Sequence, residues 1–302
     1  MSAGHPQPRR RSLNVRTNCC SVLHQRPEEI EIPTNFDNDE LEWKDCAFFF
    51  LFCPNNSGST ILSQYIASQL GAYLPPFGND EGQMAPTVKS VMRLRPWDKT
   101  RQFDWAFVRR SWEKLAKGRL FVEASPPNII RCEQIAAVFG KDSSACVSIC
   151  NPYQQIASAL RRYRTPGTDV AHIAANWMTK GTAIQSIRHN FPFFPFFTYE
   201  DFVLRPTLVN ELLAIECRPF TGTGKRDSGA RGVQDLSVRT ISFLEPNEVD
   251  AINGVLMSNS ALLEYFNYPI LDGQALHASL KSASRPEYDI GRARREAWNA
   301  VT

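Results

Sequence analysis

The chain reads Phe48-Phe49-Phe50-Leu51-Phe52-Cys53-Pro54-Asn55-Asn56-Ser57-Gly58-Ser59-Thr60 where an apolar run gives way to small and polar residues. The run stops at a proline, and helical spacing of apolar residues begins directly after this stretch. We therefore predict a buried strand over residues 47–53, a tight loop, and a helix over residues 60–70. Such a loop presents free backbone N–H groups and the positive end of the helix dipole, which favour phosphate or another oxyanion.

The side chains of this loop fit the same hypothesis of an anion site. Ser57, Ser59 and Thr60 add hydroxyl donors, and Gly58 allows the backbone to approach a ligand closely. The loop is not a Walker A motif, because that motif needs a Lys directly before the Ser or Thr and this loop contains no Lys. An ordinary strand-to-helix turn explains the same residues without a ligand, so other segments must decide between the two.

Apolar strand patterns alternate with helical patterns along the rest of the chain. Further strands are expected over residues 119–123, 144–149 and 196–199. Further helices are expected over residues 105–117, 128–139, 152–163, 171–189 and 206–215. This alternation predicts an α/β fold with a central parallel sheet flanked by helices. Ligands of such sheets bind at the carboxyl ends of the strands, where the polar segments 55–60, 123–128, 150–153 and 199–201 follow.

Composition places the chain among ordinary globular proteins. Its 302 residues are 43% hydrophobic, and a net charge of +3 is too small to indicate nucleic-acid binding. No apolar stretch is long enough to span a membrane, and the eight cysteines show no metal-ligand spacing. We expect reduced thiols and a cytoplasmic protein without a metal site, although the Arg-rich, acid-poor residues 1–27 also fit an organellar transit peptide.

We expect three parts along the chain. Residues 1–43 have the composition of a disordered or transit-like tail followed by an acidic linker. Residues 44–272 hold the α/β domain, and residues 273–302 form a C-terminal extension.

Five segments together resemble the sulfotransferase family, whose members use the sulfate donor 3′-phosphoadenosine 5′-phosphosulfate (PAPS). In chain order they are residues 55–62, the Glu-Ala-Ser-Pro-Pro-Asn of residues 123–128, the Cys-Asn-Pro-Tyr of residues 150–153 with Ser158, the Tyr-Glu-Asp of residues 199–201, and residues 244–268. The resemblance covers roughly residues 48–270 and implies a P-loop-like sulfotransferase fold and a small-molecule acceptor.

The resemblance also assigns the donor-binding residues. It implies that Asn55, Asn56, Ser57, Gly58, Ser59 and Thr60 hold the sulfate and 5′-phosphate. Ser158 is implied at the 3′-phosphate, and Tyr199 on the adenine side. A basic, Gly-containing loop over the 3′-phosphate corresponds to Lys225 or Arg226, unless these residues belong to a solvated surface loop.

Three cations of the family pattern are missing from this chain. Asn56, Ala124 and Cys150 stand where family members usually carry Arg or Lys. A hydrogen bond to a charged group is worth about 1.5–3 kcal/mol, so the three losses need substitutes if the donor is to bind tightly. Arg162, which lies four residues after Ser158 and hence on its helix face, is one candidate, with Arg161 beside it.

The catalytic assignment rests on a carboxylate. Many family members place a His two residues after the missing Lys, where this chain has Pro126, and its five His residues lie in no motif and are interpreted as structural or surface residues. Other family branches use a Glu in the loop after the first helix, and Glu81 occupies that loop here, with Asp80 and Glu123 as further candidates. We predict Glu81 as the general base and Asn56 as a catalytic amide that replaces the loop cation.

The leading hypothesis is a PAPS-dependent sulfotransferase that modifies a hydroxyl or an amine- or guanidinium-type nitrogen of a small molecule. A secondary metabolite such as an alkaloid toxin is one such acceptor. The first alternative is a catalytically impaired sulfotransferase-fold binding protein, which the missing cations favour. A P-loop kinase is the second, and the lack of a Gly-Lys-Ser/Thr sequence disfavours it. No nucleic-acid or membrane partner is expected, and the oligomeric state is left open.

Overall fold

A four-stranded parallel sheet forms the centre of the protein. The computed structural model describes residues 46–162, 168–220 and 232–301. The strands are β1 (Phe48–Phe52), β2 (Phe121–Glu123), β3 (Ser143–Ile149) and β4 (Phe196–Thr198), and they pair in the order β2-β1-β3-β4. All three pairings are parallel, with Phe50 opposite both Glu123 and Ala145. The predicted α/β class and the four predicted strands are therefore confirmed.

The central strand β1 is apolar throughout because both of its faces are covered. Side chains of a strand alternate between faces. Phe48, Phe50 and Phe52 belong to the same core as Trp112 and Phe139. Phe49 and Leu51 lie in a second core with Leu62, Ile66 and Phe202. A strand that is buried on both faces requires a continuous apolar run, and this accounts for the sequence of β1.

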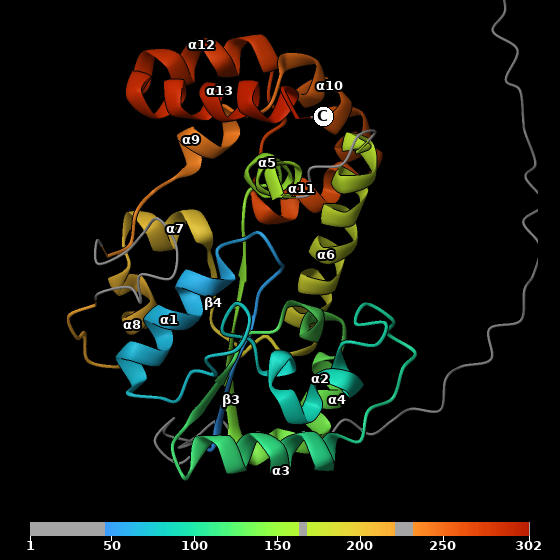
Figure 1. Ribbon diagram of the computed structural model, residues 1–302, viewed down its shortest axis with the longest axis vertical. Coiled ribbons are helices and arrows are strands. Elements are labelled where there is room, and N and C mark those ends of the chain that lie inside the picture. The colour runs from blue at the N-terminus through green and yellow to red at the C-terminus, as the bar shows by residue number, and fades with distance from the viewer. Residues whose placement is uncertain (1–45, 163–167, 221–231, 302) are drawn as a thin grey trace, which may run out of the picture. The chain divides into compact units, whose positions relative to one another are not determined.

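The helices cover the two faces of the sheet unequally. The second core is closed by α1 (Ser59–Leu70), α7 (Tyr199–Leu204) and α8 (Thr207–Leu212). The first, larger core receives side chains from α2 (Pro86–Met92), α3 (Trp105–Ala116), α4 (Cys132–Phe139), α5 (Pro152–Arg162) and α6 (Val170–Asn190). Figure 1 shows α1, α7 and α8 on one side of the strands and α2, α4 and α6 on the other.

The C-terminal part is helical. It comprises α9 (Ser237–Ile241), α10 (Pro246–Leu256), α11 (Ser260–Phe266), α12 (Gly273–Ala283) and α13 (Arg285–Asn299). The last two helices pack against α9 and α10, as Figure 1 shows at the top. Arg292 of α13 donates to the Leu244 carbonyl and pairs with Glu245 at 2.6 Å. None of the helices in the described ranges has the length and hydrophobicity that a membrane crossing requires.

Several predicted element boundaries are wrong, including the start of β2, which lies at Phe121 instead of residue 119. The helix predicted over residues 128–139 is split into a 3-10 turn, Pro126–Ile130, and α4, because Arg131 adopts a non-helical conformation between them. Tyr199 begins α7 instead of ending the strand, because Thr198 and Asp201 form a reciprocal capping box. The helix predicted over residues 206–215 ends at Leu212.

Candidate active site

The loop between β1 and α1 has an unusual backbone. Asn56 and Gly58 both have positive φ angles, of 61° and 78°. Gly58 precedes the first residue of α1, no side chain caps this helix, and its first turn contains no acidic residue. The N–H groups at the start of α1 are therefore available to an anion, in a geometry that also aligns the helix dipole with it.

Buried polar atoms without hydrogen-bond partners gather at this loop. They are Asn55 Oδ1, Asn56 Nδ2, Ser57 Oγ and, beside them, Gln155 Oε1. Gln155 belongs to the loop because its Nε2 donates to the Asn55 carbonyl at 2.7 Å. Ser57 is completely buried, and its hydroxyl lies beside the Cys150 thiol. Buried polar groups are nearly always paired in native proteins, so this cluster indicates a site for a polar ligand.

Gly58 is required at its position for a second reason, which is the ring of Tyr199. A Cβ atom on Gly58 would lie 2.1 Å from Cε2 of Tyr199. The ring of Tyr199 is buried and packs directly against the backbone of the loop. The space beside the Gly58 backbone is thus filled by the Tyr199 ring. The family resemblance implies that Tyr199 lies on the adenine side of the donor.

The structure describes some of the other predicted donor-binding residues. Ser59 and Thr60 are half-buried in the first turn of α1, and Ser158 is half-buried on α5. Arg162 is exposed at the end of α5. Lys225 and Arg226 lie outside the described residues. The roles of all these residues stay predictions.

Glu200 connects three of the motifs that the sequence singled out. Its carboxylate accepts the Asn151 backbone N–H at 2.9 Å and the Tyr268 hydroxyl at 3.0 Å. Burial raises the pKa of Glu200. The Trp177 indole N–H donates to the Cys150 carbonyl at 3.1 Å and holds the same segment from α6. The motifs therefore meet at the carboxyl ends of β3 and β4, as the parallel-sheet prediction requires.

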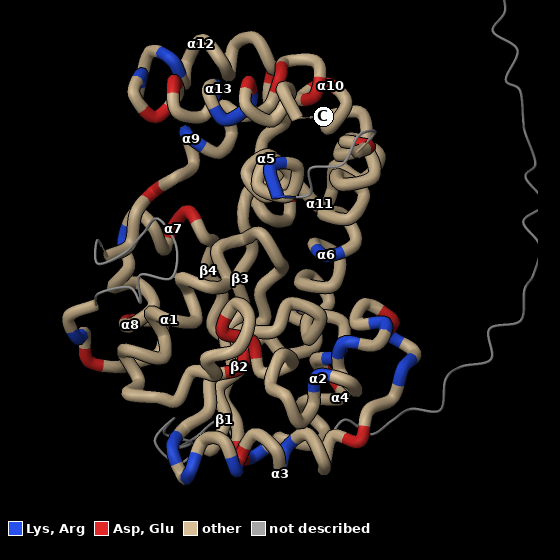
Figure 2. The backbone as a smooth tube through the Cα atoms, in the orientation of Figure 1, with Lys and Arg blue, Asp and Glu red and all other residues tan. Residues whose placement is uncertain are grey.

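Cys150 does not replace the Arg of the family pattern. Its thiol is fully buried, and burial raises its pKa well above the usual value, which keeps it neutral. A neutral thiol is a weak hydrogen-bond donor and carries no charge for a phosphate. Figure 2 shows basic residues at the end of α5 and on α6, whereas the loop from Pro54 to Gly58 has none.

The predicted base Glu81 lies in a polar cluster beside the loop. Its carboxylate is half-buried and accepts from Gln83 Nε2 at 2.5 Å and from Asn79 Nδ2 at 3.4 Å. Asp80 is 3% exposed and accepts from Gln64 Nε2 at 2.7 Å, so its carboxylate ties its loop to Gln64 of α1. Neither carboxylate lines the cavity described below.

Glu123, at the end of β2, ties two loops together. Its carboxylate is completely buried and accepts from the backbone N–H groups of Gly82 and Ser125 and from Asn128 Nδ2, at 2.7–3.0 Å. Burial outweighs these hydrogen bonds and raises the pKa of Glu123 to about 7. A Cβ atom on Gly82 would lie 2.1 Å from Glu123 Oε2, which leaves no room for another residue there.

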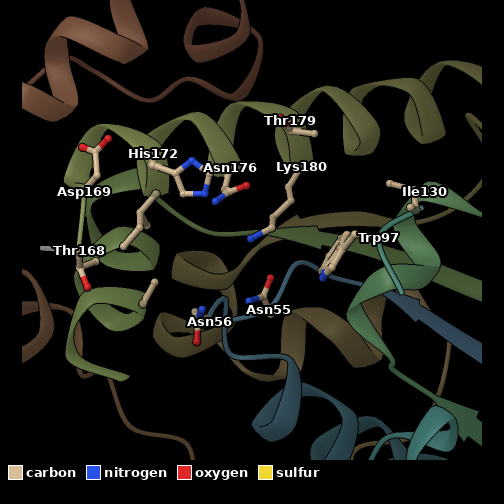
Figure 3. Close-up of a pocket in the computed structure, with 12 residues that line it drawn as sticks. Asn55, Asn56, Trp97, Ile130, Thr168, Asp169, His172, Asn176, Thr179 and Lys180 are labelled. Atoms are coloured by element: carbon tan, nitrogen blue, oxygen red, sulfur yellow. The ribbon is translucent and has the colours of Figure 1, made fainter. Parts of the chain in front are cut away.

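A cavity of about 540 Å³ opens between the loop that joins β1 to α1 and helix α6. Asn55 and Asn56 line one wall, and Trp97 and Ile130 line another. The opposite wall is one face of α6, where His172, Asn176 and Lys180 recur every four residues. Figure 3 shows Lys180 extending from α6 into the cavity, with Trp97 and Asn55 on the side toward which it points.

Sequence reasoning missed this wall. His172 was interpreted as a structural or surface residue; its side chain is exposed and also lines the cavity. Asn176 and Lys180 were not considered. The four-residue spacing of these polar groups was the available signal, but a solvated helix face produces the same spacing.

Comparisons with known proteins return matches among solved structures only. No family model and no curated protein matches the chain. Among solved structures, one neighbour is a domain of a Synechococcus olefin synthase, with a TM-score of 0.45 and 20% identity over 74% of this chain and 95% of that one. Another is a domain from the curacin biosynthetic pathway, with a TM-score of 0.40 and 18% identity over 78% of this chain and 97% of that one.

A third neighbour is a protein of Alicyclobacillus acidocaldarius, with a TM-score of 0.45 and 16% identity over 72% of this chain and 94% of that one. All three are sulfotransferases or sulfotransferase domains. No group of three His, Cys, Asp or Glu side chains within the described ranges is placed to hold a metal ion.

Proposed function

We propose that the protein is a sulfotransferase that moves a sulfuryl group from PAPS to a small molecule. The observation that carries this proposal is the cluster of unpartnered, buried polar atoms of Asn55, Asn56 and Ser57 at the uncapped start of α1. Asn56 Nδ2 and the Ser57 hydroxyl can donate to an anion, and the helix start adds free N–H groups and the positive end of a dipole. Asn55 Oδ1 can only accept, so it fits a hydrogen-bond donor group elsewhere on the ligand.

The donor supplies an activated sulfuryl group when it is bound, and the protein has to hold it and orient the acceptor. The N–H groups of the loop, with the hydroxyls of Ser57, Ser59 and Thr60, take the phosphosulfate end. Ser158, Arg162 and Lys225 or Arg226 take the 3′-phosphate, and Tyr199 lies on the adenine side. The burial of Tyr199 against Gly58 supports this placement, because the ring fixes the loop that it adjoins.

Glu81 is our candidate for the group that accepts the acceptor's proton. The amides of Gln83 and Asn79 orient its carboxylate, and it lies in the segment anchored by Glu123. Asn56 supplies an amide donor at the transferred group. A base of this kind contributes about a hundredfold to ten-thousandfold to a rate, so Glu81→Gln should lower turnover at least a hundredfold and leave donor binding intact.

The cavity beside the loop is our candidate for the part of the acceptor site that holds the body of the acceptor; Glu81 does not line it, so the reacting group has to extend from the cavity toward Glu81. Its volume of about 540 Å³ is in the range that small organic ligands occupy, and Trp97, 42% exposed, offers an aromatic wall. Among the described residues, the cavity is lined by one ammonium group, Lys180, and one carboxylate, Asp169, so its charges alone do not select between a hydroxyl and an amine or guanidinium acceptor. A secondary metabolite, including the alkaloid type considered above, and a cytoplasmic location remain parts of the proposal that only acceptor screening and localisation can test.

The deciding experiment is calorimetric titration of the full chain with PAP, the desulfated donor, with ATP as the control ligand. Binding of PAP and not of ATP is expected. Binding of ATP alone would replace the proposal with a nucleotide-dependent kinase or ATPase, and binding of neither at low salt would remove the donor site.

Two serines of this segment provide a matched pair of variants. Ser57→Ala removes a buried hydroxyl beside which the weakly hydrogen-bonding Cys150 thiol lies, so it should weaken PAP binding by roughly tenfold or more and lower stability by less than about 1 kcal/mol. Ser63→Ala removes a buried hydroxyl that already donates to the Thr60 carbonyl at 3.0 Å. The second variant should therefore lose about 1 kcal/mol of stability and keep its affinity for PAP.

A second candidate function is a binding protein that has lost catalysis. The observation that favours it is the neutral, buried thiol of Cys150, with Ala124 and Asn56 at the other two positions that lack a cation. Such a protein binds PAP but transfers no sulfuryl group to any acceptor in a broad screen with PAPS. Detection of one sulfated product is enough to reject it.

A further inference from the structure

Lys180 is the one Lys or Arg among the described residues that line the cavity. It belongs to the face of α6 that looks across the cavity at Asn55 and Asn56 (Figure 3). Its Nζ lies 5.4 Å from the centre of the Trp97 ring, which is a cation–π distance. No carboxylate within the described part of the chain forms an ion pair with it.

This environment leaves the ammonium group short of stabilising partners. Burial lowers the pKa of Lys180 to about 8, and no charge on a neighbouring group offsets that effect. A cation–π contact is worth about 0.5–2 kcal/mol and does not replace a carboxylate. Near neutral pH the group is still mostly protonated, so an anion that enters the cavity meets a poorly solvated positive charge and binds it strongly.

The position of Lys180 indicates which anionic group it binds. Asn55 and Asn56 belong to the loop and also line the cavity that Lys180 enters, so a sulfuryl group on a phosphate held by the loop would lie at the loop side of this cavity. We propose that the Lys180 ammonium group binds the sulfuryl oxygens of the donor and supplies, from α6, the positive charge that the loop lacks. This inference rests on the proposed function, because it needs PAPS on the loop.

The chemical step then assigns Lys180 an electrostatic task. The acceptor oxygen forms a bond to sulfur while the bond from sulfur to the bridging oxygen breaks. The electron pair of that bond leaves with the 5′-phosphate of PAP, and the acceptor's proton goes to the general base. Lys180 keeps its proton throughout, and its charge offsets the negative charge on the three sulfuryl oxygens as they pass from donor to acceptor.

The test uses two ligands that differ only in the sulfuryl group. PAPS and PAP are titrated separately into the wild-type chain and into Lys180→Met, which keeps the length of the side chain and removes its charge. We expect the affinity for PAPS to fall by about tenfold to a hundredfold and the affinity for PAP to change less than twofold, because only PAPS carries the group that Lys180 contacts. Lys180→Arg keeps the charge and should retain most of the PAPS affinity.

Lys281→Met is the matched control, because Lys281 is exposed on α12 and the substitution changes the net charge equally. It should leave both affinities unchanged. Lys180→Gln serves as a second neutral variant if Lys180→Met does not give a folded protein in thermal melting.

The outcomes separate this inference from the proposed function. A wild-type chain that binds neither PAP nor PAPS defeats the proposed function, and the inference fails with it. A wild-type chain that binds both, with neutral Lys180 variants that weaken both equally or neither, overturns the inference alone and leaves the donor site in place. A loss confined to PAPS in the neutral variants supports it.

Discussion

Gly58→Ala should destabilise the fold more than an alanine normally does in a loop. The residue has a φ angle of +78°, which L-residues with a Cβ atom rarely adopt. The new methyl group would also lie 2.1 Å and 2.3 Å from two carbons of the Tyr199 ring, far inside van der Waals contact. The ring is 7% exposed, so it cannot move aside into solvent without opening the core around α7.

The two effects can be estimated separately. The left-handed conformation costs a non-glycine residue about 1–2 kcal/mol. Overpacking against a buried ring costs about 1–3 kcal/mol. The sum, about 2–5 kcal/mol, corresponds to a fall of roughly 5–15 °C in Tm for a domain of this size. Gly254→Ala is the control, because that glycine lies inside α10 with open space around it and should gain up to about 1 kcal/mol.

Urea denaturation followed by circular dichroism measures both variants, and a double-mutant cycle isolates the clash. Tyr199→Ala costs about 3–5 kcal/mol by itself, because it empties a buried aromatic site. In that background Gly58→Ala should cost only the conformational part, about 1–2 kcal/mol. A loss below about 1 kcal/mol in the wild-type background, or an equal loss in both backgrounds, would refute the proposed packing of Tyr199 on the loop.

Three further predictions concern buried groups. Because the pKa of Glu123 is about 7 in the folded chain and near 4.5 when unfolded, the folded state holds more protons between these values. The contribution of Glu123 to stability should therefore be greatest below about pH 4.5 and should fall by about 3 kcal/mol as the pH rises to 7. Denaturation measured across this pH range tests the slope, which Glu123→Gln should abolish. Glu200→Ala should cost about 1–3 kcal/mol, whereas Glu200→Gln, which can pair with the same two groups, should cost under about 1 kcal/mol in the same assay. Gly291→Ala should lower the free energy of unfolding by about 1–3 kcal/mol, because its Cβ would lie 1.9 Å from Ser242 Oγ; an unchanged Tm would contradict the packing of α13 on α9.

The strands could be predicted because their determinants are local. A run such as Phe48–Phe52, buried on both faces and ended by Pro54, has few alternatives to a central parallel strand. The strand order β2-β1-β3-β4 could not be predicted in the same way, because it depends on which strand edges meet in three dimensions. The break at Arg131 was missed because the apolar spacing continues through it, while the prolines at residues 126 and 127 favour a separate 3-10 turn.

The residues of the candidate site differ in how far a sequence can point to them. The loop of residues 55–60 is contiguous, so its backbone and hydroxyl groups suggest an anion site from the sequence alone, and that role stays a prediction. The wall opposite belongs to α6, and its role depends on the helix facing the loop across a cavity. Lys180 in isolation is one charged residue on a helix, and only its burial beside Trp97 distinguishes it from a solvated lysine.

The cation missing from the loop at Asn56 and the cation of α6 that has no ion pair among the described residues therefore have one explanation in our proposal. A loop with only neutral side chains offers a dianionic phosphosulfate the N–H groups and the partial positive charge, about half a unit, of one helix dipole. That arrangement can hold an anion but leaves most of its charge uncompensated. In our proposal, the Lys180 ammonium group across the cavity compensates the charge on the sulfuryl group. The product PAP lacks the sulfuryl group and therefore makes no contact with Lys180. The neutral Lys180 variants should therefore keep their affinity for PAP and lose affinity for PAPS. Removal of a cation from the loop itself should weaken the binding of both ligands.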